Sequence, residues 1–246
     1  MKKSFIITLL GVFVAGFALA QSEETRSLSS FSKISAHEGI DVYIKEGSNE
    51  EARVVARGID IEDVLTDVSG GRLKVHLAGN NHRNVDVDVY VTYVSINAIA
   101  ASSAASLRAE DQIVTSGDFD VDVGSAGDIE ASIKADELTV DASSAGDAEL
   151  TVDVDEIEAN VSSAGDVEIE GLARVQDIEA SSSGEYDAYD VESEEVDVSA
   201  SSGGTIKVNV SQKVDARASS GGSVRYKGSP RYVDVSSSSG GSIKRY

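Results

Sequence analysis

The sequence contains no cysteine and no tryptophan, a single proline, and few aromatic residues, which make up 5% of the chain. Without cysteine there is no disulfide framework, no thiolate metal site and no cysteine to carry a lipid anchor. The scarcity of aromatic platforms argues against a sugar-cleaving cleft. Basic residues are also few: 21 Lys and Arg against 43 Asp and Glu give a net charge of −22. Nucleic acid is therefore excluded as a partner, because phosphate binding needs a basic face.

Long apolar runs are equally scarce, and the one present lies between Phe5 and Leu19, preceded by two lysines. A charged start, a short apolar segment and small residues at its end are the pattern of a secretory signal. We predict a signal peptide over residues 1–20, with cleavage between Ala20 and Gln21. The alternative, a membrane-spanning helix, needs about 20 apolar residues. The mature chain is then exported, without a membrane span, to the periplasm, the cell surface or the medium.

A short phrase built on Ser, Ala and Gly recurs through the second half of the chain. Measured at one marker glycine, successive copies are 19, 19, 19, 20, 18 and 19 residues apart. A fixed period near 20 residues is the signature of a solenoid. The marker glycines are Gly127, Gly146, Gly165, Gly184, Gly204, Gly222 and Gly241.

Apolar and polar residues alternate with period two on both sides of each small-residue corner, which is typical of strands. Like residues then stack on like residues about 4.8 Å apart. We predict an all-β fold, a right-handed, single-stranded parallel β-helix whose coils repeat every 19 residues or so. Glycine at each corner is expected to supply positive φ. One inward column is Val121, Val140, Ala159, Ile178, Val198, Ala216 and Val235.

The part of the chain before these coils is rich in strands but less regular. Residues 21–30 are polar and predict a disordered leader. Residues 31–95 form an N-terminal strand-rich region, with a strand predicted at Val85–Val94 and a short helical turn expected within Ile59–Val68. We place the β-helix coils at residues 96–246.

The order of these blocks resembles a known family. The sequence GIDVYIKEG at 39–47 is followed by VSGGRLKV at 68–75, a Val/Asp strand and the Ser-Ser-Ala-Gly-Asp coils. From Phe31 to Tyr246 this order resembles the head GIN domain family, whose members are described as "putative autotransporter adhesins" and are common in Bacteroidetes. The resemblance implies an exported β-helix with no established activity. Asp41 stands where the family's Gly-Ile-Asn motif has asparagine.

Carboxylates are the strongest candidate for a metal site. One file should consist of Asp128, Asp147, Asp166 and Glu185, and a second file, two residues further on, of Glu130, Glu149, Glu168 and Asp187. Like charges opposed across a ladder destabilise it, and a Ca²⁺ ion would relieve the repulsion through carboxylate oxygens. The alternative is a solvated acidic face that keeps an exported rod soluble. The absence of the Gly-Gly-x-Gly-x-Asp calcium repeat favours this alternative.

The charge changes sign towards the C-terminus, where residues 205–246 contain eight basic and two acidic residues. The second carboxylate file should continue as Lys207, Arg225 and Lys244. This basic end either docks onto an anionic partner, such as a cell-surface polysaccharide or the acidic flank of another copy, or only offsets local repulsion. The edge of the last coil is either shielded by the final residues or stacks on another copy.

No catalytic constellation stands out. A Gly-x-Ser-x-Gly elbow is absent, and His37, His76 and His82 lack ligand spacing. We expect no cofactor and predict a non-enzymatic envelope or surface protein, an adhesin or binding scaffold, whose partner is a cell-surface polysaccharide, a protein or a second copy. Its rivals are a polysaccharide-active β-helix enzyme and a Ca²⁺-stabilised structural spacer. A groove holding carboxylates and a Lys or Arg at one coil only would favour the enzyme.

Overall fold

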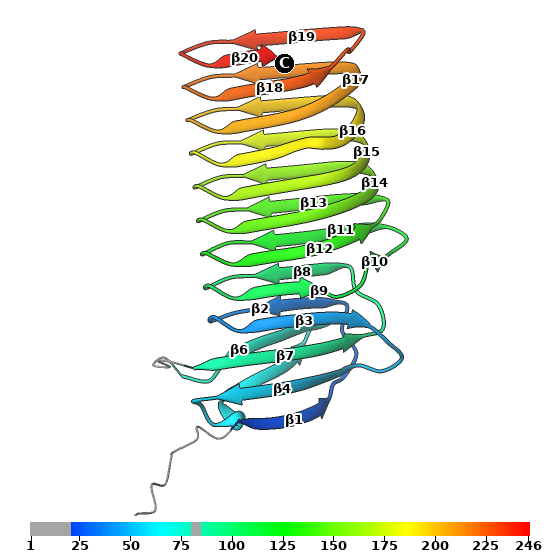
Figure 1. Ribbon diagram of the computed structural model, residues 1–246, viewed down its shortest axis with the longest axis vertical. Coiled ribbons are helices and arrows are strands. Elements are labelled where there is room, and N and C mark those ends of the chain that lie inside the picture. The colour runs from blue at the N-terminus through cyan, green and yellow to red at the C-terminus, as the bar shows by residue number, and fades with distance from the viewer. Residues whose placement is uncertain (1–20, 80–84) are drawn as a thin grey trace, which may run out of the picture.

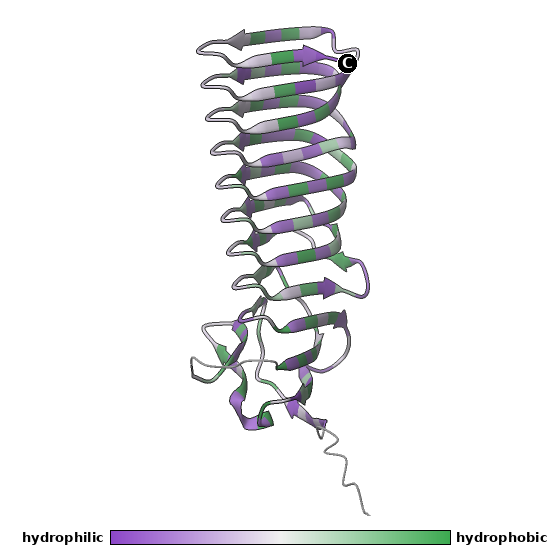
Figure 2. Cartoon of the chain, turned by 60° about the vertical axis from the view of Figure 1, so that its left-hand side comes forward, coloured by the Kyte–Doolittle hydropathy of each residue, from purple (hydrophilic) through white to green (hydrophobic). Residues whose placement is uncertain are grey.

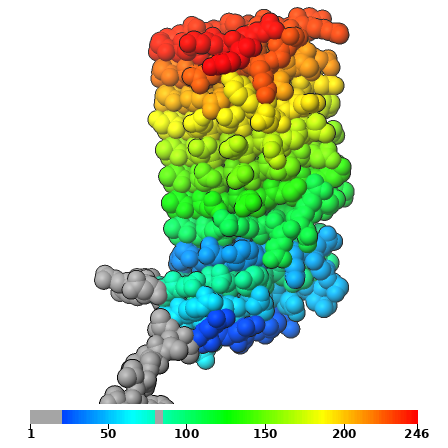
Figure 3. Space-filling model, in the orientation of Figure 1, coloured from blue at the N-terminus to red at the C-terminus, as the bar shows by residue number. Residues whose placement is uncertain are grey.

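The computed structural model describes residues 21–79 and 85–246 and shows a straight rod of stacked β-coils (Figure 1). The rod is a β-solenoid of about 8 turns, which confirms the predicted right-handed parallel β-helix. Its coils appear as successive bands along the surface (Figure 3). The predicted signal peptide and His82 lie outside the described residues.

Each coil has two walls that meet at the sharp Ser-Ala-Gly corner. We call the strands before the corner the leading wall and those after it the trailing wall. The separate leading strands are β2 (Lys33–Ala36), β8 (Ala98–Ala101), β11 (Asp118–Val123) and β13 (Glu137–Ala142). The separate trailing strands are β3 (Asp41–Glu46), β9 (Ser106–Ala109) and β12 (Asp128–Lys134). The short strand β10 (Ile113–Val114) pairs in parallel with β12.

Later coils close without a second turn. One long strand begins in the trailing wall and curves into the leading wall on the side away from the corner (Figure 1). These long strands are β14 (Asp147–Val161), β15 (Asp166–Ala180), β16 (Glu185–Ala200) and β17 (Thr205–Ala218). The rod ends with β18 (Ser223–Gly228), β19 (Tyr232–Ser237) and β20 (Ser242–Arg245).

The inward columns of the two walls form one continuous apolar core. Val121 pairs in register with Val140, and the predicted column is buried from there up to Ala216. Figure 2 shows the same alternation as apolar and polar bands along every strand. Each fully buried aliphatic side chain stabilises the fold by about 1.5–3 kcal/mol, so the repeated columns explain why a chain of simple composition folds as a rod.

The corner corrects one sequence expectation. Positive φ falls on the residues before the marker glycine, such as Ser125 (φ 50°) and Ala126 (φ 58°), whereas Gly127 itself does not have it. The marker glycine is needed because a Cβ there would run into the backbone of the coil below; at Gly146 it would lie 2.7 Å from Val123 O. Glycine therefore serves close approach between coils, and small residues bear the left-handed turn.

The N-terminal strand-rich region consists of one further coil and a cap below it. Strands β2 and β3 pair in parallel with β8 and β9 and already form a complete coil. Its corner is His37-Glu38-Gly39, with positive φ at Glu38 and Gly39. The sequence did not reveal this coil because its corner lacks the Ser-Ala-Gly phrase.

The cap below this coil closes both walls with antiparallel strands, β4 (Glu51–Arg57) on β7 (Asp86–Tyr93) and β5 (Val64–Ser69) on β6 (Arg72–Leu77). Only η1 (Ile61–Asp63) of the expected helical turn is helical, and the residues from Val64 onward belong to β5. The leader predicted to be disordered contains strand β1 (Ser22–Ser27), which pairs with β4. It is ordered because β4 needs a partner at its free edge and Arg26 donates hydrogen bonds to the carbonyl oxygens of Ile61 and Val64.

At the C-terminal end of the rod, apolar side chains of the last coils are exposed, unlike those beneath the N-terminal cap. Val233 and Val235 are 51% and 45% exposed, although their counterparts in lower coils are buried. The Arg245 guanidinium donates to Gly228 O and Ser229 Oγ, so it ties the last two coils together without covering the valines. Tyr246 is 81% exposed; its ring lies edge-on to Tyr189 at 6.3 Å, and its backbone N–H donates to Tyr226 O. The expected shielding by these two residues is thus incomplete.

Candidate functional site

One file of outward side chains runs the full length of the trailing wall, and we call it the charged file. Its members are neighbours in the strand register from the cap to the last coil. The charged file consists of Arg53, Tyr90, Tyr43, Arg108, Glu130, Glu149, Glu168, Asp187, Lys207, Arg225 and Lys244. It joins the predicted acidic and basic residues into one surface and extends them to a basic and aromatic segment that the sequence alone did not place there.

The acidic centre of the charged file has a second file beside it, as predicted. Asp128, Asp147, Asp166 and Glu185 stack in register. Partial burial, followed by repulsion from Asp128, raises the pKa of Asp147; partial burial, followed by repulsion from Glu185 and Asp147, raises that of Asp166. Within the described residues no three Asp, Glu or His side chains converge closely enough to hold a metal ion. The stacked carboxylates therefore lie in a line along the rod, and this arrangement does not place several of them around one cation.

The charge of this file changes from negative to positive at Lys207. Its Nζ lies 2.8 Å from Glu185 Oε1 and 2.8 Å from Asp187 Oδ2, in the coil below. The hydrogen bonds to Asp187 and Glu185 raise the pKa of Lys207, so it stays charged. Arg225 and Lys244 come next in the file, and in the part of the chain that the structure describes neither side chain makes an ion pair or a hydrogen bond. The unpaired positive charge is thus concentrated in the last two positions.

The cap end of the charged file is a stack of rings and guanidinium groups. The Tyr43 and Tyr90 rings are 5.0 Å apart and 16° from parallel, and Arg53 lies 3.9 Å from the centroid of the Tyr90 ring. Arg108 continues the file and makes an ion pair with Glu130 at 3.3 Å. This stack links the antiparallel cap to the parallel coils. Sequence reasoning missed it because its members come from separate strands.

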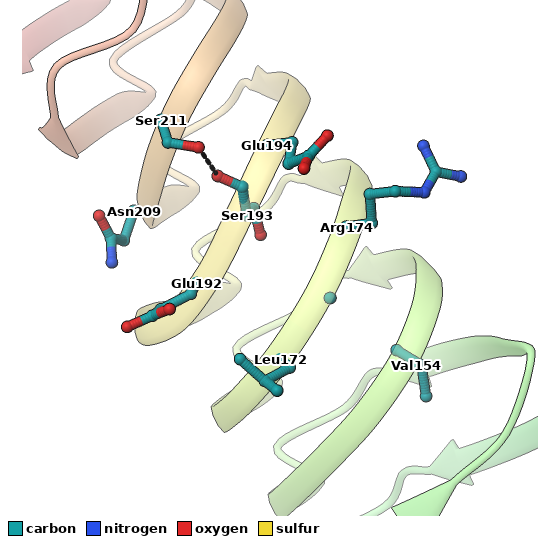
Figure 4. A pocket seen from close by; sticks show the side chains of 9 residues that line it. Val154, Leu172, Arg174, Glu192, Ser193, Glu194, Asn209 and Ser211 are labelled. Atoms are coloured by element: carbon teal, nitrogen blue, oxygen red, sulfur yellow. Dashed lines mark hydrogen bonds between the residues drawn. The ribbon is translucent and has the colours of Figure 1, made fainter.

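A groove interrupts the repeat on the curved side of the rod, away from the corners. It has a volume of about 590 Å³ and crosses four successive strands, β14 to β17 (Figure 4). We call it the coil-break groove. Its lining residues are Val154, Leu172, Ala173, Arg174, Glu192, Ser193, Glu194, Asn209 and Ser211.

The groove lies where the repeat changes length. The coil that ends at Gly204 has 20 residues and the next has 18, and the register between β16 and β17 shifts after Ala188 and again after Ser193. The pairing of β15 with β16 has a further register shift, between Glu168 and Glu170. The unequal steps were visible in the sequence, and they are the signal that could have located the groove.

Charged side chains at the groove are left without partners. Arg174, Glu192 and Glu194 are exposed, and in the described structure none of their side chains takes part in an ion pair or a hydrogen bond. Leu172 beside them is 52% exposed. In Figure 4, Arg174 and Glu194 stand along one side, and Leu172, Glu192 and Asn209 along the other. Such unpaired groups around a hollow are available to a ligand.

A buried polar cluster supports the floor of the groove. Tyr186 Oη donates to Gln176 Oε1 at 2.8 Å, and Gln176 Nε2 donates to Ser193 Oγ at 2.7 Å. Ser211 Oγ donates to the backbone carbonyl of Ser193 at 2.9 Å. Complete burial raises the pKa of Tyr186, so its hydroxyl stays protonated and remains a donor. Tyr186 lies in the same inward column as Ile129 and Val167, but its hydrogen-bond partners cannot be read from the repeat.

The histidines lie near the cap. His37 Nδ1 is 2.8 Å from Ser102 Oγ across neighbouring corners, and burial lowers the pKa of His37. His76 Nε2 is 3.0 Å from Asp67 Oδ2 on the paired strand of the β5–β6 hairpin. Both contacts join neighbouring strands or coils.

The structural class of this protein is a parallel β-solenoid with a charged outer face. The family described as "Putative auto-transporter adhesin, head GIN domain" matches residues 30–230, and the chain belongs to it. Among curated proteins, no sequence matches the chain. In the described residues, no helix has the length and apolar character needed to cross a membrane.

Solved structures share the fold at low sequence identity. A putative adhesin from Parabacteroides merdae has 17% identity and a TM-score of 0.85, with 92% of this chain and 96% of that chain covered. One from Parabacteroides distasonis has 15% identity and a TM-score of 0.86, covering 93% and 98%. A putative lipid binding protein from Parabacteroides distasonis has 19% identity and a TM-score of 0.78, covering 92% and 96%. These likenesses establish the solenoid and not its ligand.

Proposed function

We propose that this chain is an exported, non-enzymatic protein of the envelope or cell surface that binds other molecules in the manner of an adhesin. The single observation that carries the proposal is the charged file, a straight surface that runs from the cap to the last coil on a rigid core. Membership of a family described as adhesins supports it. A signal peptide over residues 1–20 would deliver it, and its partner is a cell-surface polysaccharide, a protein or a second copy.

The basic end of the charged file is the part that we assign to an anionic partner. Arg225 and Lys244 are unpaired, whereas Lys207 is already neutralised by Glu185 and Asp187. The acidic centre would repel the same partner, so the charge pattern selects the end of the rod for contact. Contacts of this kind weaken as salt rises, because the charges are exposed.

Binding of residues 21–246 to whole bacterial cells and to a glycan array, at low and high salt, tests this proposal. We expect salt-sensitive binding that the double variant Arg225→Gln, Lys244→Gln reduces. Lys213→Gln is the matched control, because Lys213 lies on the leading wall and pairs with Glu195 at 3.8 Å. Binding that is constant across salt, or unchanged in the double variant, rejects the charged file as the contact surface.

The coil-break groove gives the enzyme alternative its one specific support. It holds Glu192, Glu194 and Arg174 at a single interruption of the repeat, the arrangement that a polysaccharide-active site would need. Incubation with cell-wall and plant polysaccharides, followed by measurement of new reducing ends, distinguishes the two functions. We expect no new ends; turnover that Glu192→Gln abolishes would establish the enzyme instead.

A further inference from the structure

We propose that the coil-break groove binds a short segment of neutral saccharide. The inference rests on the proposed function in that it treats the chain as a binding protein, and it names a second contact surface and its ligand class. The groove is separate from the charged file, because it lies where the trailing wall curves into the leading wall, at the register shifts of β16 around Ser193.

The size of the groove fits a small ligand. Its volume of about 590 Å³ falls within the range of small-molecule sites, roughly 300–1,000 Å³. Four strands contribute to it, and three spacings of about 4.8 Å make it about 14 Å long across the strands. A site of this shape accommodates a short chain of linked sugar units lying across the coils.

The groups at the groove match the chemistry of hydroxyl-rich ligands. Glu192 and Glu194 are unpaired acceptors for sugar hydroxyls, and Arg174 and Asn209 are donors. Leu172, 52% exposed, offers an apolar surface to the C–H face of a ring. Hydrogen bonds between an ionised group and a neutral hydroxyl are stronger than those between neutral groups, so unpaired charges at the rim give useful affinity.

Charge selects against anionic saccharides. The groove carries two carboxylates and one guanidinium, on a chain whose net charge is −22. A polyuronate or a sulfated glycan would meet repulsion both at the groove and from the rod as a whole. The neutral ligand assigned here therefore differs from the anionic partner assigned to Arg225 and Lys244.

The groove is preformed because its floor is fixed. Ala173 and Ser193 are buried, and Ser193 is hydrogen-bonded to Gln176 and Ser211. Tyr186 completes this cluster from inside the core. A rigid floor lowers the entropic cost of binding, since the protein groups do not have to be ordered by the ligand.

Titration of residues 21–246 with short neutral glucan, mannan and xylan oligosaccharides, followed by calorimetry and ligand-observed NMR, tests the assignment. Short oligogalacturonates serve as the anionic comparison. We expect at least one neutral oligosaccharide to bind, with affinity reduced about tenfold or more by Arg174→Gln or Glu192→Gln. Glu179→Gln and Arg217→Gln change the same residue types on the leading wall and should bind like the parent chain.

The outcomes separate this inference from the proposed function. Equal binding by the groove variants, binding of oligogalacturonates in preference to neutral chains, or no binding by any neutral oligosaccharide overturns the assignment. Whole-cell binding lost in Arg225→Gln, Lys244→Gln but kept in Arg174→Gln would leave the proposed function standing even then. Oligosaccharide binding without any cell binding would support the groove assignment and reject the proposed function.

Discussion

The lower coils (residues 118–180) and the upper coils (residues 185–228) share one corner and one core but differ in regularity. The lower coils repeat every 19 residues, bury mainly aliphatic side chains and carry stacked carboxylates. The upper coils change step, contain Tyr186 and Ser193 in the core, and reverse the sign of the charged file at Lys207. Gln176, at the top of the lower coils, completes the polar cluster. Repetition builds the wall of the rod, and the departures from repetition create surfaces that differ from one coil to the next.

The largest effect should come from the feature common to both sets of coils, the marker glycine. Gly204→Ala places a Cβ against the backbone of Ala180 in the coil below, and Gly165→Ala places one 2.8 Å from Ala142 O. Because backbone cannot rotate away, we expect each to lower the free energy of unfolding by about 3 kcal/mol. Urea denaturation checks both values.

Gly203→Ala is the matched control at the adjacent residue. Its φ is 81°, but a Cβ there meets only Ser183 Oγ, at 3.5 Å. Ser183 occupies the same corner position one repeat earlier, and Ala164 two repeats earlier. The left-handed backbone should cost about 1 kcal/mol. Equal costs at 203 and 204 would contradict the explanation of the corner by close approach.

The next largest effect should come from the buried polar cluster, which lies where the two sets of coils meet. Tyr186→Phe leaves Gln176 Oε1 without its donor, so we expect a loss of about 1–2 kcal/mol in the free energy of unfolding. Tyr246→Phe, at an exposed position, should have no effect. The double variant Tyr186→Phe, Gln176→Leu should lose less than the sum of its single changes, and strict additivity would show that the hydrogen bond is not stabilising.

The stacked carboxylates predict an unusual dependence on pH. The pKa values of Asp147 and Asp166 are raised in the folded chain, mainly by burial and then by neighbouring carboxylates. Above the ordinary carboxyl pKa near 4 the folded state therefore holds more protons than the unfolded state, and its stability falls as pH rises through the folded pKa. We expect these two groups to favour folding more at pH near 4 than near 7.

Urea denaturation at the two pH values measures this difference. Replacing both residues, Asp147→Asn with Asp166→Asn, should reduce the gain on acidification. Lys207, which pairs with the same file, does not contribute to the difference, because its pKa is raised and it stays protonated over the whole interval. A pH dependence that is the same in the double variant would show that the carboxylate file does not control it.

Calcium should have the smallest effect. Asp128, Asp147, Asp166 and Glu185 form a line, and the described residues contain no three-membered acidic cluster for a metal. We expect Ca²⁺ to change the melting temperature no more than Mg²⁺ at equal ionic strength, since both only screen the repulsion. A saturable rise specific to Ca²⁺, reversed by chelator, would instead support the structural spacer.

The repeat period, the inward columns and the stacking of Asp128 on Asp147 could all be predicted from the sequence, because a parallel coil places each residue above its counterpart one period earlier. The tertiary structure decided what periodicity does not encode. It assigned positive φ to Ser125 and Ala126, and it placed Tyr43 beside Tyr90 across strands far apart in the chain. It also opened the coil-break groove at the unequal steps, because a change in coil length has a structural meaning only once neighbouring coils are packed together.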